Sequence, residues 1–298
     1  MKLVDGLIFA ICACFCILVI YLVFQEKLRY QSDFFNQTDK LAFLFLIYDE
    51  INQEDLWFDY FKNVDKSKYS IYIHYKVNKH LKHFEQYKID NCIDTKWGDI
   101  SLARAQLLLY ETAVQDKQNK KFIILSNSCI PVKNFNYTYN FLMKDDKSYF
   151  NEAPLDPRLY TGDELLKSNY KQSEIKKASQ WFIVNRDLAE LIVEHKSDTQ
   201  YFETVHAPDE LFFLTTILKY RTREQAKIEL YKNIPFATTF TNWYNMDYRF
   251  SKENNRFSGP YNYDTITEEE MNYILSSNSL FARKFNKNCR VVSFISSV

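Results

Sequence analysis

Between residues 40 and 126, runs of apolar residues alternate with segments whose apolar residues recur at helical intervals. Three strand-like runs, rich in aromatic and branched side chains, occupy residues 40–48, 69–75 and 121–126. Two segments with apolar side chains at three- and four-residue intervals lie between them, at residues 51–64 and 102–115. Continuous apolar runs are typical of strands that are buried on both faces, and parallel strands are joined through helices. The alternation therefore predicts an α/β fold with a mostly parallel central sheet flanked by helices.

The second half of the chain continues this mixture and shows no linker that would divide the body. Helical patterns occupy residues 134–143, 187–195 and 207–220, and a further helix with a basic tip fills residues 268–285. Residues 179–185 and 236–243 again have a composition typical of β-strands. The polar stretch from 145 to 177 contains several turn-forming residues, so we interpret it as an insertion or a ligand-facing loop.

Glycine is scarce, with four in 298 residues and no two close together. Loops that wrap phosphates with backbone N–H groups need several glycines within a few residues, so a P-loop and a dinucleotide fingerprint are both absent. Any phosphate must therefore be met by lysine or arginine side chains. The formal net charge is zero, so no basic excess is available for a nucleic-acid backbone and we expect no nucleic-acid partner.

The N-terminus carries 18 uncharged and almost wholly apolar residues, at 7–24. At a rise of about 1.5 Å per residue a helix of this length nearly crosses a hydrocarbon core of about 30 Å. No small-x-small cleavage site follows it. The sequence predicts a cytoplasmic tail at 1–6, a transmembrane signal anchor at 7–24, a polar stem at 25–39 and one globular domain at 40–298. A single N-terminal span before a large body predicts a type II protein with a lumenal domain.

Residues 206–218, HAPDELFFLTTIL, set Asp209 and Glu210 after a proline and ahead of an apolar helical run. Acids in a first helical turn are stabilised by the macrodipole, and proline is favoured there. A structural role therefore explains the pair without any chemistry, and a catalytic role needs support from the rest of the chain.

Six sequence blocks provide that support through their order along the chain. They read WGDISLARAQLLLYETAV (97–114), FIILSNSCIPVKNFNYTYNFL (122–142), KKASQWFIVNR (176–186), APDELFFLTTIL (207–218), TTFTNW (238–243) and LFARKF (280–285). Together they resemble the core-2/I-branching β-1,6-N-acetylglucosaminyltransferases, glycosyltransferase family 14, and are most similar to its plant-type branch. The resemblance spans most of residues 40–290.

The resemblance implies a GT-A fold, an inverting mechanism that needs no metal ion, and a type II membrane protein in the lumen of the Golgi or secretory pathway. The donor would be a UDP-sugar, carrying N-acetylglucosamine or xylose, and the acceptor a hydroxyl of a glycan or glycoprotein. The sequence agrees independently on one point, because it contains no Asp-x-Asp, the usual metal clamp of nucleotide-sugar enzymes. The cysteines Cys92, Cys129 and Cys289 also lack metal-ligand spacing, so no metal site is predicted.

The family pattern assigns roles to particular residues of this chain. Glu210 would be the general base that takes the acceptor proton, with Asp209 holding the turn or orienting its neighbour at the acceptor. Lys284, with Arg283 beside it, would balance the charge of the departing diphosphate. The structural alternative for Arg283 and Lys284 is a solvated basic pair.

Further contacts follow from strand-end positions and from side-chain chemistry. Candidate donor-binding residues at the ends of strands are His74, Ser126 and Ser128. Candidate acceptor-binding residues, chosen because indole faces suit sugar C–H surfaces and amides suit hydroxyls, are Ser179, Gln180, Trp181 and Trp243, together with Asp209. A tryptophan buried in a strand and a serine that closes a turn would explain these residues without any ligand.

Two positions depart from the family pattern. Lys76 stands where relatives often carry an aspartate after His74, and Asp264 stands where a second arginine is common, which leaves Arg249 or Arg256 as substitutes. The departures keep open a membrane-anchored glycan-binding protein that retained the fold without turnover. The sequence also leaves open a metal-dependent transferase and a glycoside hydrolase. The hydrolase would need a second acid close to Glu210, and the sequence does not nominate one.

Overall fold

The structure, a computed structural model of the chain, describes residues 38–155, 170–171, 173–231, 237–243 and 259–291, with residues 18, 19, 21, 22, 25 and 165. The chain divides into two compact units, Met1–Asp39 and Lys40–Val298. Most of the predicted span at 7–24 lies outside the described residues. Among the residues that are described, no helix has the length and apolar character needed to cross a membrane.

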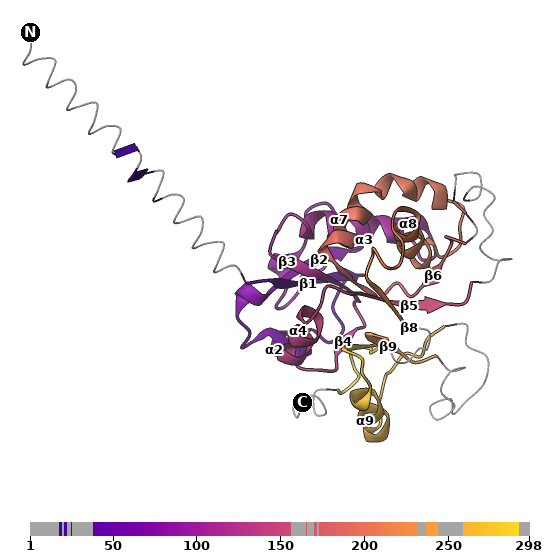
Figure 1. Ribbon diagram of the computed structural model, residues 1–298. Helices are drawn as coiled ribbons and strands as arrows, with labels where there is room; N and C mark the ends of the chain where they lie inside the picture. Colours follow the sequence, from indigo (N-terminus) through magenta and orange to yellow (C-terminus); the bar gives the residue numbers. More distant parts are fainter. Residues whose placement is uncertain are drawn as a thin grey trace, which may run out of the picture. The chain divides into compact units, whose positions relative to one another are not determined.

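In the described part of the second unit, a seven-stranded sheet has the order β2-β1-β3-β7-β5-β6, with β8 paired to β5 (Figure 1). Its strands are β1 (Lys40–Ile47), β2 (Tyr69–Tyr75), β3 (Asn119–Ser126), β5 (Ser148–Ala153), β6 (Lys177–Ala178), β7 (Ile183–Asn185) and β8 (Ile228–Tyr231).

The prediction of a mostly parallel sheet is confirmed for β2, β1 and β3 and is wrong beyond β3. β1 pairs in parallel with both neighbours. β7 then runs antiparallel to β3 and to β5, and β6 runs antiparallel to β5, while β8 is parallel to β5. An apolar run specifies a strand but not its direction, which is set by the connection that precedes it. The sheet is therefore mixed.

The side chains of β1 show why helices cover both faces of the sheet. Successive residues of a strand point to opposite faces, and β1 is buried on both. Phe43 packs against Trp57 and Phe61 on one face, whereas Leu44 belongs to the core on the other. Figure 1 shows α3 (Ile100–Ala113), α7 (Arg186–Glu194) and α8 (Phe212–Tyr220) on one side, and α2 (Glu54–Phe61) and α4 (Phe135–Met143) on the other.

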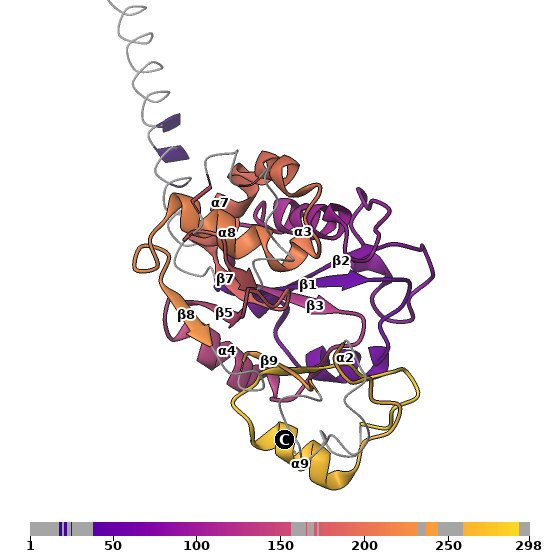
Figure 2. The ribbon, with the colours of Figure 1, turned by 90° about the vertical axis from the view of Figure 1, so that its right-hand side faces the viewer.

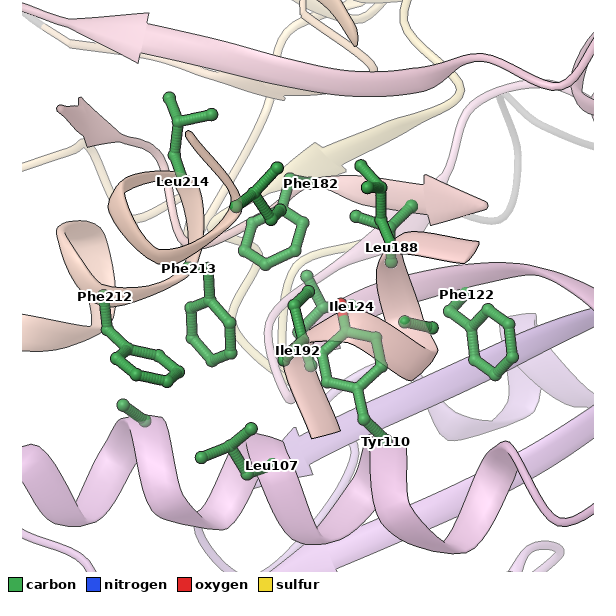
Figure 3. Close-up of a cluster of buried hydrophobic side chains, with 14 of the residues drawn as sticks. Leu107, Tyr110, Phe122, Ile124, Phe182, Leu188, Ile192, Phe212, Phe213 and Leu214 are labelled. Carbon is green, nitrogen blue, oxygen red and sulfur yellow. The ribbon is translucent and has the colours of Figure 1, made fainter. Parts of the chain in front are cut away.

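The layer under α3, α7 and α8 holds the larger core (Figure 3). The ring centroid of Phe213 lies 5.2 Å from that of Phe182 and 6.2 Å from that of Tyr110, and all three rings are buried. Each buried aromatic side chain of this kind stabilises the fold by about 1.5–3 kcal/mol. This core fixes α8, and with it the turn that precedes α8.

A smaller sheet lies on the side of α2 and α4 (Figure 2). Its strands are β4 (Ile130–Pro131), β10 (Phe281–Arg283) and β9 (Thr239–Thr241), with β10 antiparallel to β4 and parallel to β9. α9 (Glu268–Ser276) packs on it and begins with a capping box between Thr267 and Glu270. The single helix predicted over residues 268–285 is therefore wrong in its last part: α9 ends at Ser276, and the basic tip includes a strand, β10.

Short 3-10 helices lie in the connections between longer elements: η1 (Lys66–Lys68), η2 (Glu85–Tyr87), η3 (Lys196–Phe202) and η4 (Pro208–Glu210). The helix predicted at 207–220 is divided between η4 and α8. Ala207 adopts a left-handed conformation with φ of 50°, and Pro208 follows it, so a regular helix begins only at Phe212. The two acids therefore occupy a separate turn.

Arg186, the first residue of α7, joins this helix to the turn between α3 and β3. Its Nε donates to the carbonyl of Asn119 at 2.8 Å, and its Nη1 donates to the carbonyl of Val114 at 3.2 Å. Its Nη2 donates to the carbonyl of Asp116. Val114 is the C-cap of α3, so one guanidinium satisfies carbonyls at a helix end and at a strand start.

Replacing Arg186 by methionine keeps the apolar stem and removes these donors. We expect R186M to lower the free energy of unfolding by about 2–3 kcal/mol, because charged hydrogen bonds to carbonyls are lost. Urea unfolding of the 298-residue chain measures the change. The matched control is K117M, since Lys117 is 77% exposed and lies 3.8 Å from Glu190. For K117M we expect a change in the free energy of unfolding of under about 0.5 kcal/mol. Equal effects of the two substitutions would show that the hydrogen bonds of Arg186 do not stabilise the fold.

Candidate functional site

The turn η4 presents one acid to solvent and buries the other. The N–H of Ala207 donates to the carbonyl of Gly98 at 3.3 Å, and the N–H of Glu210 donates to the carbonyl of Ala207 at 3.1 Å. Glu210 is partly exposed, whereas Asp209 is only 8% exposed. The turn therefore has an accessible carboxylate beside a buried one.

Glu210 forms an ion pair with a lysine that the sequence analysis did not identify. Lys177 Nζ lies 3.1 Å from Glu210 Oε2, and both side chains are partly exposed. Lys177 comes from β6, two residues before Ser179 in the block KKASQWFIVNR. Its place in that block was the available signal, but a single sequence does not show that β6 faces η4.

Burial changes the behaviour of Asp209. Loss of hydration, reinforced by the negative charge of Glu210, raises the pKa of Asp209 to about 7, although Lys177 and Arg283 act in the opposite direction. Asp209 Oδ1 is buried and has no hydrogen-bond partner among the described residues. The buried acid is therefore partly protonated near neutral pH.

Arg283 brings the small sheet to the acids. Its guanidinium carbon lies 4.2 Å from the ring centroid of Trp181, close enough for a cation–π contact. Burial lowers the pKa of Arg283 to about 10, opposed by Cys129, Glu210 and Asp209. Its buried Nε lacks a hydrogen-bond partner among the residues described. A buried guanidinium that has an unpaired N–H and feels the charges of two acids is typical of a site that binds a polar ligand.

Lys284 has different neighbours. Burial and the adjacent charge of Arg283 lower the pKa of Lys284 to about 8, and Cys129 opposes this shift. The N–H of the next residue, Phe285, donates to the carbonyl of Ser128 at 2.9 Å. Lys284 thus lies near the carboxyl end of β3, and neither acid is among the groups that shift its pKa.

The serines after β3 are engaged with one another. Ser126 Oγ lies 3.1 Å from Ser128 Oγ and 3.2 Å from Cys129 Sγ, and all three residues are buried. The indole N–H of Trp57 donates to the carbonyl of Cys129 at 2.9 Å. These contacts hold the turn at residues 126–129, which contains Cys129, a neighbour of Lys284. Cys129, like Cys92 and Cys289, is a free thiol.

His74 lies inside the protein. Its side chain has no exposed surface, and Nε2 accepts the N–H of Ile93 at 3.0 Å. Burial lowers the pKa of His74 to about 4, so the imidazole is neutral at physiological pH. Lys76, at the position that departs from the family, lies 3.4 Å from Asp94 and donates to the carbonyl of Thr95. Both residues hold the loop that follows β2.

The predicted acceptor residues are only partly brought together. Trp181 contacts Arg283 through its ring, and the backbone N–H of Trp181 donates to Ser179 Oγ at 3.3 Å. Gln180 is buried and its amide donates to Gln106 Oε1 at 3.4 Å. Trp243 is partly exposed, two residues beyond the end of β9. Trp181 contacts Arg283, and Asp209 is one of the two acids of η4.

The metal requirement and the second cation stay predictions. Within the described ranges, no three acidic, histidine or cysteine side chains form a group that could hold a metal ion. Asp264 accepts a hydrogen bond from Asn286 Nδ2 at 2.6 Å. Arg249 and Arg256, the proposed substitutes for the second arginine, lie outside the described residues.

Two solved structures of LgtC are among those that match the chain. An active-site mutant of LgtC gives a TM-score of 0.38 and 9% identity, with 81% of this chain and 86% of that chain covered. The galactosyltransferase LgtC in complex with donor and acceptor sugar analogs gives a TM-score of 0.31 and 8% identity, with 66% and 88% covered. Likeness at this level identifies neither the fold nor the chemistry of this chain.

The sequence comparisons are stronger. Glycosyltransferase BC10 of Oryza sativa subsp. japonica is 27% identical over 171 residues, which are 55% of this chain and 43% of that protein. The match thus spans less than half the length of this relative. The family model described as "Core-2/I-Branching enzyme" matches residues 41–275, which is well over half of the chain. The chain therefore belongs to the core-2/I-branching enzyme family.

Proposed function

We propose that this protein is a glycosyltransferase that moves N-acetylglucosamine or xylose from a UDP-sugar to a hydroxyl of a glycan or glycoprotein, with inversion and without a metal ion. Glu210 is the general base and Lys284 stabilises the departing diphosphate. The observation that carries the proposal is the meeting of the acid turn η4 with β6 and β10. Lys177 lies 3.1 Å from Glu210, and Arg283 packs on Trp181, where the charges of both acids act to raise its pKa.

The position of Glu210 supports its role as a base. An inverting displacement needs one group that takes the proton of the attacking hydroxyl from an accessible position. Glu210 is partly exposed and Lys177 orients its carboxylate, whereas Asp209 is buried and partly protonated near neutral pH. Asp209 is better suited to hold the turn or to donate a hydrogen bond.

The cations support a charge-balancing role. The departing UDP carries a diphosphate, and preorganised positive groups in a partly dehydrated site stabilise such developing charge strongly. Lys284 and Arg283 are adjacent and partly buried. His74, Ser126 and Ser128 would then act on the donor indirectly, because their side chains are buried and hold the loops after β2 and β3.

The cellular setting is part of the proposal. The apolar residues 7–24 would anchor the chain as a single-pass type II protein, with a GT-A-type domain in the lumen of the Golgi or secretory pathway. The acceptor would lie along Ser179, Gln180, Trp181 and Trp243, beside Asp209.

Removing the base should abolish most turnover. We expect E210Q to lower kcat by about 100- to 10,000-fold, with little change in the KM of the donor, because only proton transfer is lost. A screen of UDP-sugars with UDP release as the readout identifies the donor and measures both constants. The matched control is E203Q, since Glu203 is an exposed carboxylate paired with Arg104. Near-normal turnover by E210Q would refute the assignment of the base.

The lysine should set an alkaline limit. Because the pKa of Lys284 is lowered to about 8, its charge is present below that pH and is lost above it. We expect kcat/KM for the donor to fall above about pH 8. K284R keeps its charge in this range, so the decline should move up by about one pH unit or more. K287R, on an exposed lysine near Glu50, is the control and should leave the alkaline decline of kcat/KM at the same pH. An alkaline decline at the same pH in K284R would contradict the assignment.

Chelation should leave the reaction intact. We expect the same initial rate with and without excess EDTA, since Arg283 and Lys284 replace a divalent ion. Added Mn²⁺ or Mg²⁺ should not stimulate the chelated enzyme. A rate that falls on chelation and returns with metal would show a metal-dependent transferase instead.

A further inference from the structure

Trp97 is the most exposed large apolar side chain among the described residues, with 81% of its surface open. A single exposed apolar side chain is common on protein surfaces, so exposure alone does not indicate a site. Large aromatic side chains are, however, the residues that most often anchor ligands and partners. The position of Trp97 decides between these two cases.

Trp97 lies on a braced turn. The N–H of Lys96 donates to Ser101 Oγ at 2.9 Å, and the N–H of Asp99 donates to the carbonyl of Lys96 at 3.2 Å. Asp99 also caps α3, since Oδ1 accepts the N–H of Ser101 at 2.9 Å. Gly98 has a φ of 73°, a left-handed conformation that favours glycine. The backbone that carries the indole is therefore held firmly at the start of a long buried helix.

This turn is attached to the turn that carries Glu210. The carbonyl of Gly98 accepts the N–H of Ala207 at 3.3 Å, and the carbonyl of Ala207 accepts the N–H of Glu210 at 3.1 Å. The ring centroids of Trp97 and His206 lie 5.9 Å apart in an edge-to-face arrangement. The exposed indole and the proposed base thus share one small connected group of backbone contacts.

Trp97 also offers what Trp181 does not. Trp181 is 8% exposed and Arg283 lies 4.2 Å from its ring centroid, so one face of that indole is occupied by a cation. A sugar needs an open ring, because the C–H groups on one face of a pyranose pack against the electron-rich face of an indole. The hydroxyls at the sugar rim stay in water on such a platform, so little polar surface has to be desolvated.

We propose that Trp97 is a stacking platform for a pyranose ring of the acceptor glycan, next to the sugar whose hydroxyl Glu210 deprotonates. This inference rests on the proposed function, from which it takes the identity of the base. It adds an acceptor contact in the turn before α3, far in sequence from the acceptor residues proposed at 179–181. A flat nucleobase could stack on an indole equally well, and the experiment separates the two.

The kinetic test compares W97A, W97F and Y137A in the 298-residue chain. We expect W97A to raise the KM of the acceptor about tenfold, with kcat and the KM of the donor within about twofold. W97F, which keeps an aromatic face, should recover most of the loss. Tyr137 is an exposed aromatic residue of α4, so Y137A should behave as wild type. A rise in the KM of the donor alone, or no change in either KM, would overturn the proposal.

A binding test without donor keeps the inference independent of turnover. Saturation-transfer NMR with methyl β-galactoside, β-xyloside and β-N-acetylglucosaminide should show ring C–H contacts that W97A loses and Y137A retains. Methyl glycosides are used because an aryl aglycone would itself stack on the indole. Trp97-dependent contacts without transfer by wild type would refute the proposed function and keep the platform. Transfer by wild type with unchanged contacts and KM in W97A would refute the platform alone.

Discussion

The candidate site depends on how the segment after α9 docks at the exit of β3. Asn52 and Gln53, just before α2, donate from their side-chain amides to the carbonyls of Phe285 and Asn286 at 2.8 and 2.7 Å. The N–H of Phe285 in turn donates to the carbonyl of Ser128. These bonds hold Phe285 and Asn286, and so position Arg283 at the last residue of β10 and Lys284 directly after it. Cations over 70 residues from Glu210 in sequence reach the acids only because this docking holds.

How much of the fold the sequence predicts depends on how local its causes are. β1, β2 and β3 were predicted almost to the residue because each contains a short run rich in aromatic and branched apolar side chains. β5, SYFNEA, was missed because it is polar toward its end and half-buried there, and β8 is partly exposed throughout. The reversal at β7 was also missed, since pairing direction depends on long-range packing rather than on composition.

The site was predicted from the family blocks, and its internal contacts were not. The acids and the cations could be named from the sequence, and the structure brings Glu210, Asp209 and Arg283 into one electrostatic group. Lys177 could not be identified as the partner of Glu210, because the two are 33 positions apart and joined only through tertiary packing. Nor could the sequence show that His74 is fully buried, since strand-end residues are equally often exposed.

Trp181, between β6 and β7, contacts Arg283 of the small sheet, and this explains a division between the aromatic residues of the site. Arg283 belongs to β10 of the small sheet, whereas Glu210 belongs to η4, the turn before α8. A desolvated guanidinium next to two acids needs a rigid, weakly polar support, and the indole of Trp181 provides one through its face. An indole that supports a cation in this way has less free surface for a sugar. The open indole is that of Trp97, at the turn that begins α3, where it stays exposed and is linked to the turn of Glu210 through the backbone of Gly98 and Ala207.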